Sequence, residues 1–131
     1  MDILQPPGWP RPKGYSNGIS ASGRFIVTGG LVGWNEKEEF PHEDMAGQAR
    51  QTFENIAAVL AEGGAKPEHM IRMTWYITSK EEYLGSVKDI GQAYRDVFGK
   101  NFPAMAVVEV SALMEDEAKM EVEVMAVVPE D

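Results

Sequence analysis

Two alternating runs near the end of the chain constrain the fold more than any other feature. They are Asn101–Val110, NFPAMAVVEV, and Ala118–Val128, AKMEVEVMAVV. Alternation with a period of two is typical of β-strands, in which successive side chains point to opposite faces. Each run has one wholly apolar face and one face on which Met and Val stand beside Glu. A half-buried strand normally has an apolar face and a polar face, so the mixed faces need an explanation.

The preceding sequence predicts three further strands and two helices. The expected strands are Tyr15–Ser22, Arg24–Thr28 and Met70–Thr78, with the first two joined as a hairpin across Ser22-Gly23. The expected helices are Glu43–Glu62, ended by Gly63-Gly64, and a second that begins at the capping sequence Ser79–Glu82 and ends at Gly99. Apolar residues recur at i, i+4, i+7 and i+11 in both helices. Met1–Gly14 contains four prolines and is expected to be an extended lead-in on the surface, with Trp9 as a packing anchor.

This order of elements predicts an α+β fold, a mixed sheet with both helices on one face. The other sheet face would then carry Met105, Val107, Met125 and Val127. Leaving such side chains in water sacrifices roughly 1.5–3 kcal/mol each, and monomers rarely expose a patch of this kind. We therefore expect other copies of the chain to cover the second face, with Glu109, Glu121 and Glu123 at or near subunit interfaces.

Three glycines in Gly29–Gly33 raise the possibility of a phosphate-binding loop. A P-loop needs a Lys-Ser/Thr pair and a helix directly after it, and this sequence has neither. The glycines are better explained by a strand bulge, or by the close approach of another backbone or a ligand.

Composition narrows the classes of function. The 131 residues suffice for one domain, residues 1–131, with no apolar run long enough for a membrane span and no secretory signal. Cysteine is absent, which fits a reducing compartment, and we expect a cytoplasmic protein. The net charge of −9 argues against nucleic acid as a partner. His42 and His69 lack partners at metal-ligand spacing, so no metal site is expected.

The sequence resembles the RidA (YjgF) family of enamine/imine deaminases over nearly its whole length from about Tyr15. The matching segments are GYSNGI, FIVTGGLVGWN, QARQTFENIAAVLAEGGA, NFPAMAVVEV and KMEVEVMAV. This resemblance implies a chorismate-mutase-like fold and a homotrimer, in which the sheets form a central β-barrel and ligand clefts lie between subunits. It also implies hydrolysis of small 2-imino or 2-enamino acids to 2-oxo acids and ammonium, without a metal or an organic cofactor.

The chain departs from the family pattern at the position that binds the substrate carboxylate in the family. The family has P-A-R-x-x-V-E-V, and its Arg binds the substrate carboxylate through two parallel hydrogen bonds. Here that residue is Met105, which has no charge and no donor, so a contact worth roughly 2–5 kcal/mol in a desolvated site is lost. At Val107, often Cys in the family, the backbone carbonyl is the group implied to hold the attacking water. Arg24 and Arg72 could replace the lost cation, but no pattern places them in a cleft, so both are expected on the surface.

Other family positions retain their residues. Tyr15 matches the cleft tyrosine, Gly30 matches a glycine whose backbone lines the cleft, and Glu121 matches the glutamate that positions or activates water. Gly29 stands in place of a neighbouring Ser, and Gly91 in place of an Asn. The resemblance thus implies Glu121 as the catalytic residue and Tyr15, Gly29, Gly30, Met105 and Val107 as substrate-binding residues.

Three functions follow as hypotheses. The first is a hydrolytic deaminase of a small enamine or imine with atypical specificity, and the second is a non-catalytic trimer that binds a small metabolite. The third, a ribonuclease or translation inhibitor, is disfavoured by the charge of −9 and by the lack of a His/Lys pair. Structural roles also stay open: Glu121 as an interface salt bridge or backbone cap, Tyr15 as packing and Met105 as core filler.

Overall fold

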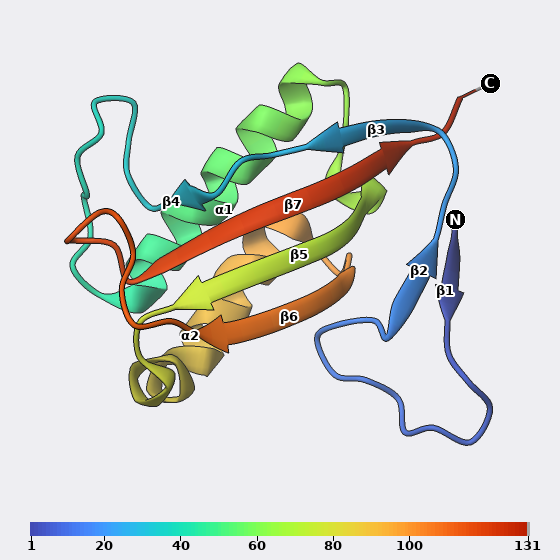
Figure 1. The fold of residues 1–131 in the computed structure, drawn as a ribbon, viewed down its shortest axis with the longest axis horizontal. Coiled ribbons are helices and arrows are strands. Elements are labelled where there is room, and N and C mark those ends of the chain that lie inside the picture. The colour runs from blue at the N-terminus through green and yellow to red at the C-terminus, as the bar shows by residue number, and fades with distance from the viewer. Residues whose placement is uncertain (131) are drawn as a thin grey trace.

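The computed structural model describes residues 1–130; Asp131, the last residue of the expected single domain, lies outside them. The order of elements along the chain is shown in Figure 1. The strands are β1 (Asp2–Leu4), β2 (Gly18–Ser20), β3 (Arg24–Val27), β4 (Leu31–Val32), β5 (Met70–Ile77), β6 (Ala104–Glu109) and β7 (Met120–Val128). The helices are α1 (Met45–Glu62), the 3-10 turn η1 (Pro67–His69) and α2 (Lys80–Phe98).

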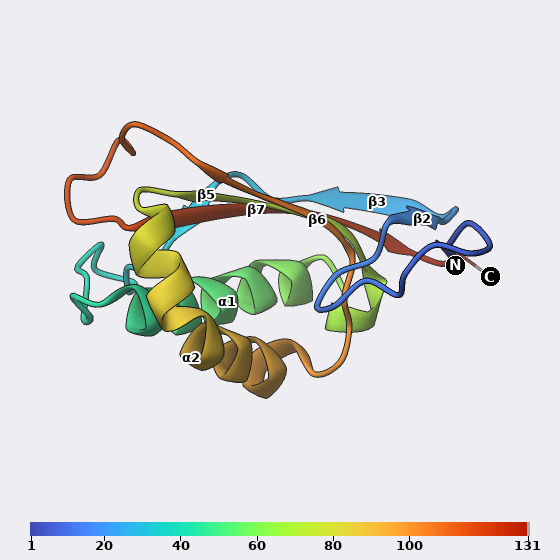
Figure 2. The same cartoon turned by 90° about the horizontal axis from the view of Figure 1, so that it is seen from below.

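The main sheet is mixed and its longest strand, β7, lies inside it. Its order is β3-β7-β5-β6, and β4 also pairs with β7 beyond the end of β3. Strands β5 and β6 are parallel, whereas β7 runs antiparallel to β3, β4 and β5. Figure 2 shows α1 and α2 together on one side of this sheet, with no described element layered on the other. The expected α+β class, with two helices on one sheet face, is confirmed.

Both helices begin and end close to the predicted residues. The carboxylate of Asp44 accepts a hydrogen bond of 3.0 Å from the backbone N–H of Gly47 and caps α1. The hydroxyl of Ser79 accepts one of 3.0 Å from the N–H of Glu82 and caps α2. Such side chains satisfy N–H groups that the first helical turn leaves without partners. Gly99 ends α2 with a φ of 68°, a conformation that costs glycine little.

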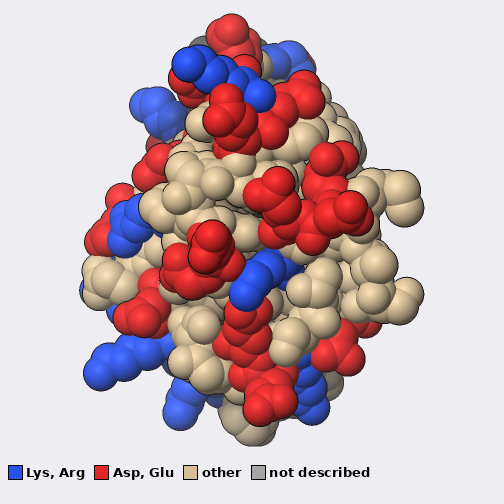
Figure 3. All heavy atoms as spheres, turned by 90° about the vertical axis from the view of Figure 1, so that its left-hand side faces the viewer, with Lys and Arg blue, Asp and Glu red and all other residues tan. Residues whose placement is uncertain are grey.

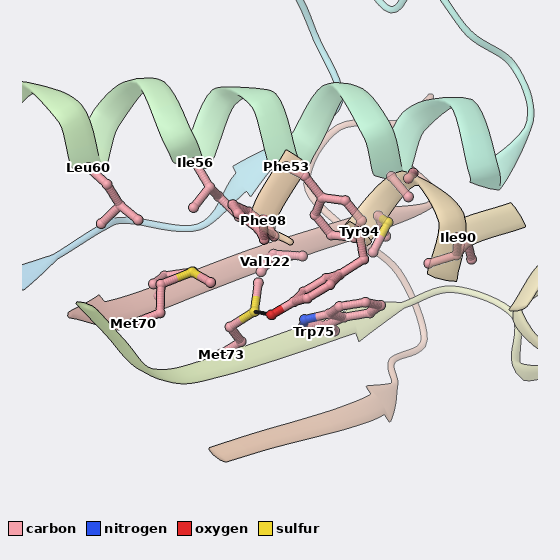
Figure 4. Packing of buried hydrophobic residues seen from close by; sticks show 14 of the residues in the cluster. Phe53, Ile56, Leu60, Met70, Met73, Trp75, Ile90, Tyr94, Phe98 and Val122 are labelled. Carbon is pink, nitrogen blue, oxygen red and sulfur yellow. Dashed lines mark hydrogen bonds between the residues drawn. The ribbon is translucent and has the colours of Figure 1, made fainter. Parts of the chain in front are cut away.

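The core lies between the helices and the sheet, and Phe53 of α1 is at its centre (Figure 4). Its ring centroid lies 5.3 Å from that of Trp75 on β5, 5.5 Å from Tyr94 and 5.4 Å from Phe98, both on α2. Tilted and edge-on ring pairs at these distances add to the stabilisation from burial. Burial raises the pKa of Tyr94, whose hydroxyl donates to the backbone carbonyl of Asn101. One aromatic cluster therefore joins both helices to the sheet.

The strand register corrects the expected sheet faces. Met105 and Val107 on β6 pair with Met73 and Trp75 on β5, whose side chains are buried beneath the helices. Paired residues in a sheet point to the same face, so both lie on the covered face, where they pack against the core. Glu121 pairs with Tyr76 on the open face. The prediction that Met105 and Val107 share the open face with Met125 is wrong. Strand β6 does not pair with β7; it pairs with β5, and the register of that pairing turns Met105 and Val107 toward the helices.

The open face is nevertheless apolar in part. Phe25 and Val27 on β3 are 61% and 64% exposed, and Val108 on β6 is 42% exposed. Burial of these exposed side chains, and not of Met105 and Val107, is therefore the reason to expect that other copies of the chain cover the open face. The homotrimer with a central β-barrel stays a prediction.

The predicted hairpin between Tyr15–Ser22 and Arg24–Thr28 is wrong. Strand β2 pairs with β1, and β3 pairs with the far end of β7. Ser16 is fixed instead to the start of β6, since its N–H donates to the carbonyl of Pro103 over 3.0 Å. The lead-in includes β1 and is exposed as expected, but Trp9 is 59% exposed and anchors no core among the described residues.

The glycine segment after β3 allows close approach and forms no phosphate loop. The chain continues into β4 and a loop, and α1 starts only at Met45. A Cβ at Gly33 would lie 2.6 Å from the backbone oxygen of Gln48 on α1, so this position must lack a side chain. The predicted approach of another backbone is therefore confirmed at Gly33.

The aromatic core gives a first prediction. Phe53→Ala should lower the free energy of unfolding by about 3–5 kcal/mol, since it empties the contact between both helices and β5. Val59→Ala is the control on the same helix; that side chain is 41% exposed, and the expected loss is about 0.5 kcal/mol or less. Guanidinium unfolding at one fixed protein concentration measures both. Equal losses would contradict the central role of Phe53.

Candidate functional site

Glu121 lies on the open face of β7, directly over Gly30. A Cβ placed at Gly30 would come 2.2 Å from the Oε2 atom of Glu121. The absence of a side chain at residue 30 therefore makes the room that the carboxylate occupies. At Gly29, by contrast, a Cβ would have no atom within 4 Å and would stand in open space. Within residues 1–130 the Glu121 carboxylate has neither an ion-pair nor a hydrogen-bond partner.

A second carboxylate stands beside it. The hydroxyl of Tyr76 donates a hydrogen bond of 2.7 Å to Oε1 of Glu123. This bond, then burial and the negative charges of Glu123 and Glu121, raise the pKa of Tyr76, while Arg72 opposes the shift. Arg72 and Glu123 line a small cavity of about 190 Å³ on the same face. The open face thus presents a free carboxylate, a phenol and a cation close together.

Met105 borders a different cavity, of about 280 Å³, between β6, α2 and the N-terminal segment. Its walls are mainly aromatic and aliphatic, and they include Trp75, Tyr83, Ile90 and Phe102. Burial raises the pKa of the Tyr83 phenol, which keeps that group neutral. This hollow can take the apolar part of a small ligand.

Tyr15 lies next to this cavity. It lines a hollow of about 640 Å³ together with Trp9, and the two hollows share Gly14 and Phe102. The Tyr15 side chain is 43% exposed. The backbone around Ser16, which is bonded to the start of β6, holds Tyr15 at this end of the sheet.

The predicted site residues therefore fall into two groups. Glu121 and Gly30 meet on the open face, with Gly29 next to Gly30 in the chain. Met105 and Val107 belong to the covered face, with Tyr15 beside the cavity of Met105. One chain does not bring the two groups together. Of the two candidate cations, Arg72 is on the open face, and Arg24 lies by Gly64 at the end of α1.

One stripe of α2 was missed by the sequence reasoning. Tyr83, Val87, Gly91 and Arg95 all line the cavity beside Met105. Residues four apart lie on one face of a helix, so the spacing was visible in the sequence. The apolar positions predicted for this helix were instead Tyr83, Val87, Ile90 and Tyr94. Of these, Ile90 and Tyr94 are buried in the core, whereas Val87 is 47% exposed and lines the cavity.

Membrane-spanning and metal-binding features are both missing from the described part of the chain. No helix there is both long and apolar enough to cross a membrane. No group of three or more His, Asp or Glu side chains in residues 1–130 is arranged to hold a metal ion.

Comparison with known proteins identifies the family. The model of the endoribonuclease L-PSP family matches residues 10–128. The chain is 30% identical to the 2-iminobutanoate/2-iminopropanoate deaminase of Escherichia coli over 113 residues, which are 86% of each protein. The chain therefore belongs to the RidA/YjgF/L-PSP family.

Solved structures agree with this assignment. A Rid-family protein of unknown function from Yersinia pestis, YyfB, aligns with a TM-score of 0.84 and 26% identity, covering 97% of this chain and 98% of that one. TdcF of E. coli, solved with bound serine, aligns with a TM-score of 0.69 and 27% identity over 98% of this chain and 99% of its own.

The contact between Gly30 and Glu121 gives a second prediction. Gly30→Ala should lower the free energy of unfolding by about 1 kcal/mol, because the half-buried Glu121 side chain must move away from the added methyl group. Gly29→Ala is the matched control, with open space around the new methyl group and an expected change within about 0.5 kcal/mol. Guanidinium unfolding checks both.

A double variant isolates the cause. In a Glu121→Ala background the added methyl group meets no carboxylate, so Gly30→Ala should lose most of its effect. An unchanged loss in that background would show that the strand backbone, and not Glu121, determines the need for glycine.

Proposed function

We propose that this protein is a hydrolytic deaminase of a small enamine or imine metabolite. The observation that carries the proposal is the Glu121 carboxylate held over Gly30, in a chain 30% identical to an iminobutanoate/iminopropanoate deaminase across 86% of both proteins. A free carboxylate in a site closed to water by a ligand is suited to general acid–base chemistry.

The reaction needs a positioned water and no bound cofactor. Water adds to the imine carbon, and its proton passes through Glu121 to the nitrogen. In the carbinolamine so formed, the hydroxyl proton passes to the nitrogen by the same route as the carbon–nitrogen bond breaks, giving the oxo compound and ammonia. Glu121 acts first as the base and then as the acid, so its carboxylate is regenerated. The second carboxylate, Glu123, is engaged by Tyr76 and serves as a structural neighbour.

Met105 sets this protein apart in the proposal. We assign the protein to a subgroup that lacks the substrate-binding arginine, because Met105 stands at the arginine position. The Met105 side chain packs against the core and borders a cavity with mainly apolar walls. Its substrate specificity is then atypical, since a thioether cannot form the two parallel hydrogen bonds that bind a carboxylate.

We further propose a homotrimer with ligand sites between subunits. The separation of Glu121 and Gly30 from Met105, Val107 and Tyr15 supports this arrangement, because a neighbouring copy would supply the missing half of each site. The exposed apolar side chains of the open face, Phe25 and Val27 among them, favour its burial against other copies.

A second candidate is a non-catalytic protein that binds a small metabolite in the same cleft. The similarity to TdcF solved with bound serine favours it, as does the loss of the arginine. Endoribonuclease activity is the description of the family model, but the net charge of −9 opposes binding to phosphates.

Ammonium release tests the deaminase. With 2-iminopropanoate and with a neutral enamine, each generated in situ, the protein should release ammonium faster than buffer alone on at least one substrate. Glu121→Gln should lower kcat/KM by about 10²–10⁴, the share of a general base. Glu123→Gln makes the same change two residues along the same face and should stay within about threefold.

The outcomes separate the two candidates. No acceleration on either substrate would leave the metabolite-binding protein as the better account. Equal loss in the Gln variants of Glu121 and Glu123 would remove Glu121 from its catalytic role.

Mixing of two inactive variants tests the shared site. Glu121→Gln impairs one half and Gly91→Trp fills the cavity of the other, so neither alone should be active. When the two variants are co-expressed in equal amounts, about one interface in four joins an intact Glu121 half to an intact cavity half. The mixture should therefore recover about one quarter of the wild-type rate. Light scattering should give a trimer. No recovery would place both halves in one chain.

A further inference from the structure

The cavity beside Met105 has an apolar interior and a cationic rim. Trp75, Ile90, Phe102 and Met105 form its walls, while Lys13 and Arg95 are the charged residues that line it. No Asp or Glu of residues 1–130 lines this cavity. The composition of the wall suits a ligand with an apolar body and an anionic end.

The neighbouring hollow extends this pattern. It carries Arg11 and Lys100 and again no acidic residue from the described part of the chain. Four basic residues and no acidic residue of the described part of the chain thus line the two hollows, although the chain has 12 basic and 21 acidic residues. Like charges so arranged around low-dielectric walls raise the local concentration of anions.

Acidic side chains gather elsewhere. Figure 3 shows them on the side of the molecule formed by the loops at the ends of β4 and β6, away from the N-terminal strands. A hollow of about 540 Å³ at these loops is lined by Glu43, Glu115, Asp116 and Glu117. The excess of basic residues is therefore confined to the two hollows near Met105, and the loops at the ends of β4 and β6 are mainly acidic.

Arg95 is available for a ligand. Asp96, the acid next to it on α2, forms its ion pair with Arg50 of α1 at 2.7 Å, and it also accepts a hydrogen bond from Gln92. Among residues 1–130, the only hydrogen bond that the Arg95 side chain donates is a long one, of 3.3 Å, to Gln92. Its guanidinium lies across Gly91, where a Cβ would stand 3.4 Å from Nη1. A side chain at residue 91 would crowd the guanidinium, so Gly91 leaves room beside Arg95 at the cavity.

We propose that Arg95, with Lys13, binds the carboxylate of the ligand whose apolar body lies against Met105. The cation that the family carries on the strand is then supplied by the helix that faces it across the cavity. Arginine suits this role because its planar fork binds a carboxylate through two parallel hydrogen bonds. The inference rests on the proposed function in taking this cavity as part of the ligand site and, for the substrate class, in taking an imine as the group that reacts.

The position of the cation defines the substrate class. Arg95 is exposed and lies at the rim, whereas Trp75 and Ile90 are buried behind it. A ligand held by its carboxylate at the rim fills the interior only if its side chain is larger than a methyl group. We therefore assign 2-imino acids with branched or aromatic apolar side chains, in preference to the three-carbon acid.

Calorimetric binding of product-type ligands tests the assignment in the full-length protein. The probes are 4-methyl-2-oxopentanoate, pyruvate and the neutral 4-methylpentan-2-one. The branched acid should bind at least about fivefold more tightly than pyruvate. Arg95→Gln should weaken its binding about tenfold or more, Arg95→Lys should recover part of the loss, and the neutral ketone should bind both forms alike.

Lys88→Gln is the matched control. It removes the same charge from an exposed position on the same helix, outside both hollows, and should leave binding within about twofold. Equal weakening by the Gln variants of Arg95 and Lys88, tighter binding of pyruvate, or no binding of the branched acid would each overturn the inference.

The two proposals can fail separately. Binding that depends on Arg95 without ammonium release would reject the deaminase and support the inference. Turnover that depends on Glu121, with a KM for the branched imino acid unchanged by Arg95→Gln, would support the deaminase and reject the inference.

Discussion

The contact of Phe53 with Trp75, Tyr94 and Phe98 holds the remaining structure in place. It joins α1 to β5 and to α2, with ring centroids 5.3–5.5 Å apart. Because both helices meet at this point, they cover one side of the sheet and leave the other free. The same contact keeps α2 beside β6, and the space between them is the cavity of Met105. The core thus determines where a ligand can lie.

The place of Glu121 depends on polar contacts just before its strand and in the middle of it. Before β7, the buried Gln48 of α1 accepts a hydrogen bond from the N–H of Lys119 and donates to the carbonyl of Glu117. Further along, the Thr28 hydroxyl accepts from the N–H of Val124. Buried polar groups need such partners, so β7 is fixed in register, and Glu121 is fixed over the glycine that gives it room.

The sequence predicts the bounds of the helices and strands better than it predicts which strands pair and which face each side chain takes. Capping residues and periodicity located α1, α2, β5 and β7 to within one or two residues. The face of Met105 could not be predicted, because alternation within one strand says nothing about its neighbour, and a pairing shifted by one residue inverts the face. The hairpin failed for the same reason: β3 pairs with β7, near the opposite end of the chain. For the site, the resemblance supplied single residues, whereas the gathering of Arg95 and Lys13 at one cavity required the fold.

Arg95 is exposed on α2 at the rim of the cavity, and this has a consequence for how the protein can change. A cation on a core-facing strand must be desolvated, and replacing it disturbs the packing around it. A cation on the outer turn of a helix carries little of the folding free energy. Ligand preference in this chain can therefore drift, by selection or by design, through substitutions at the helix surface while the aromatic core stays as it is.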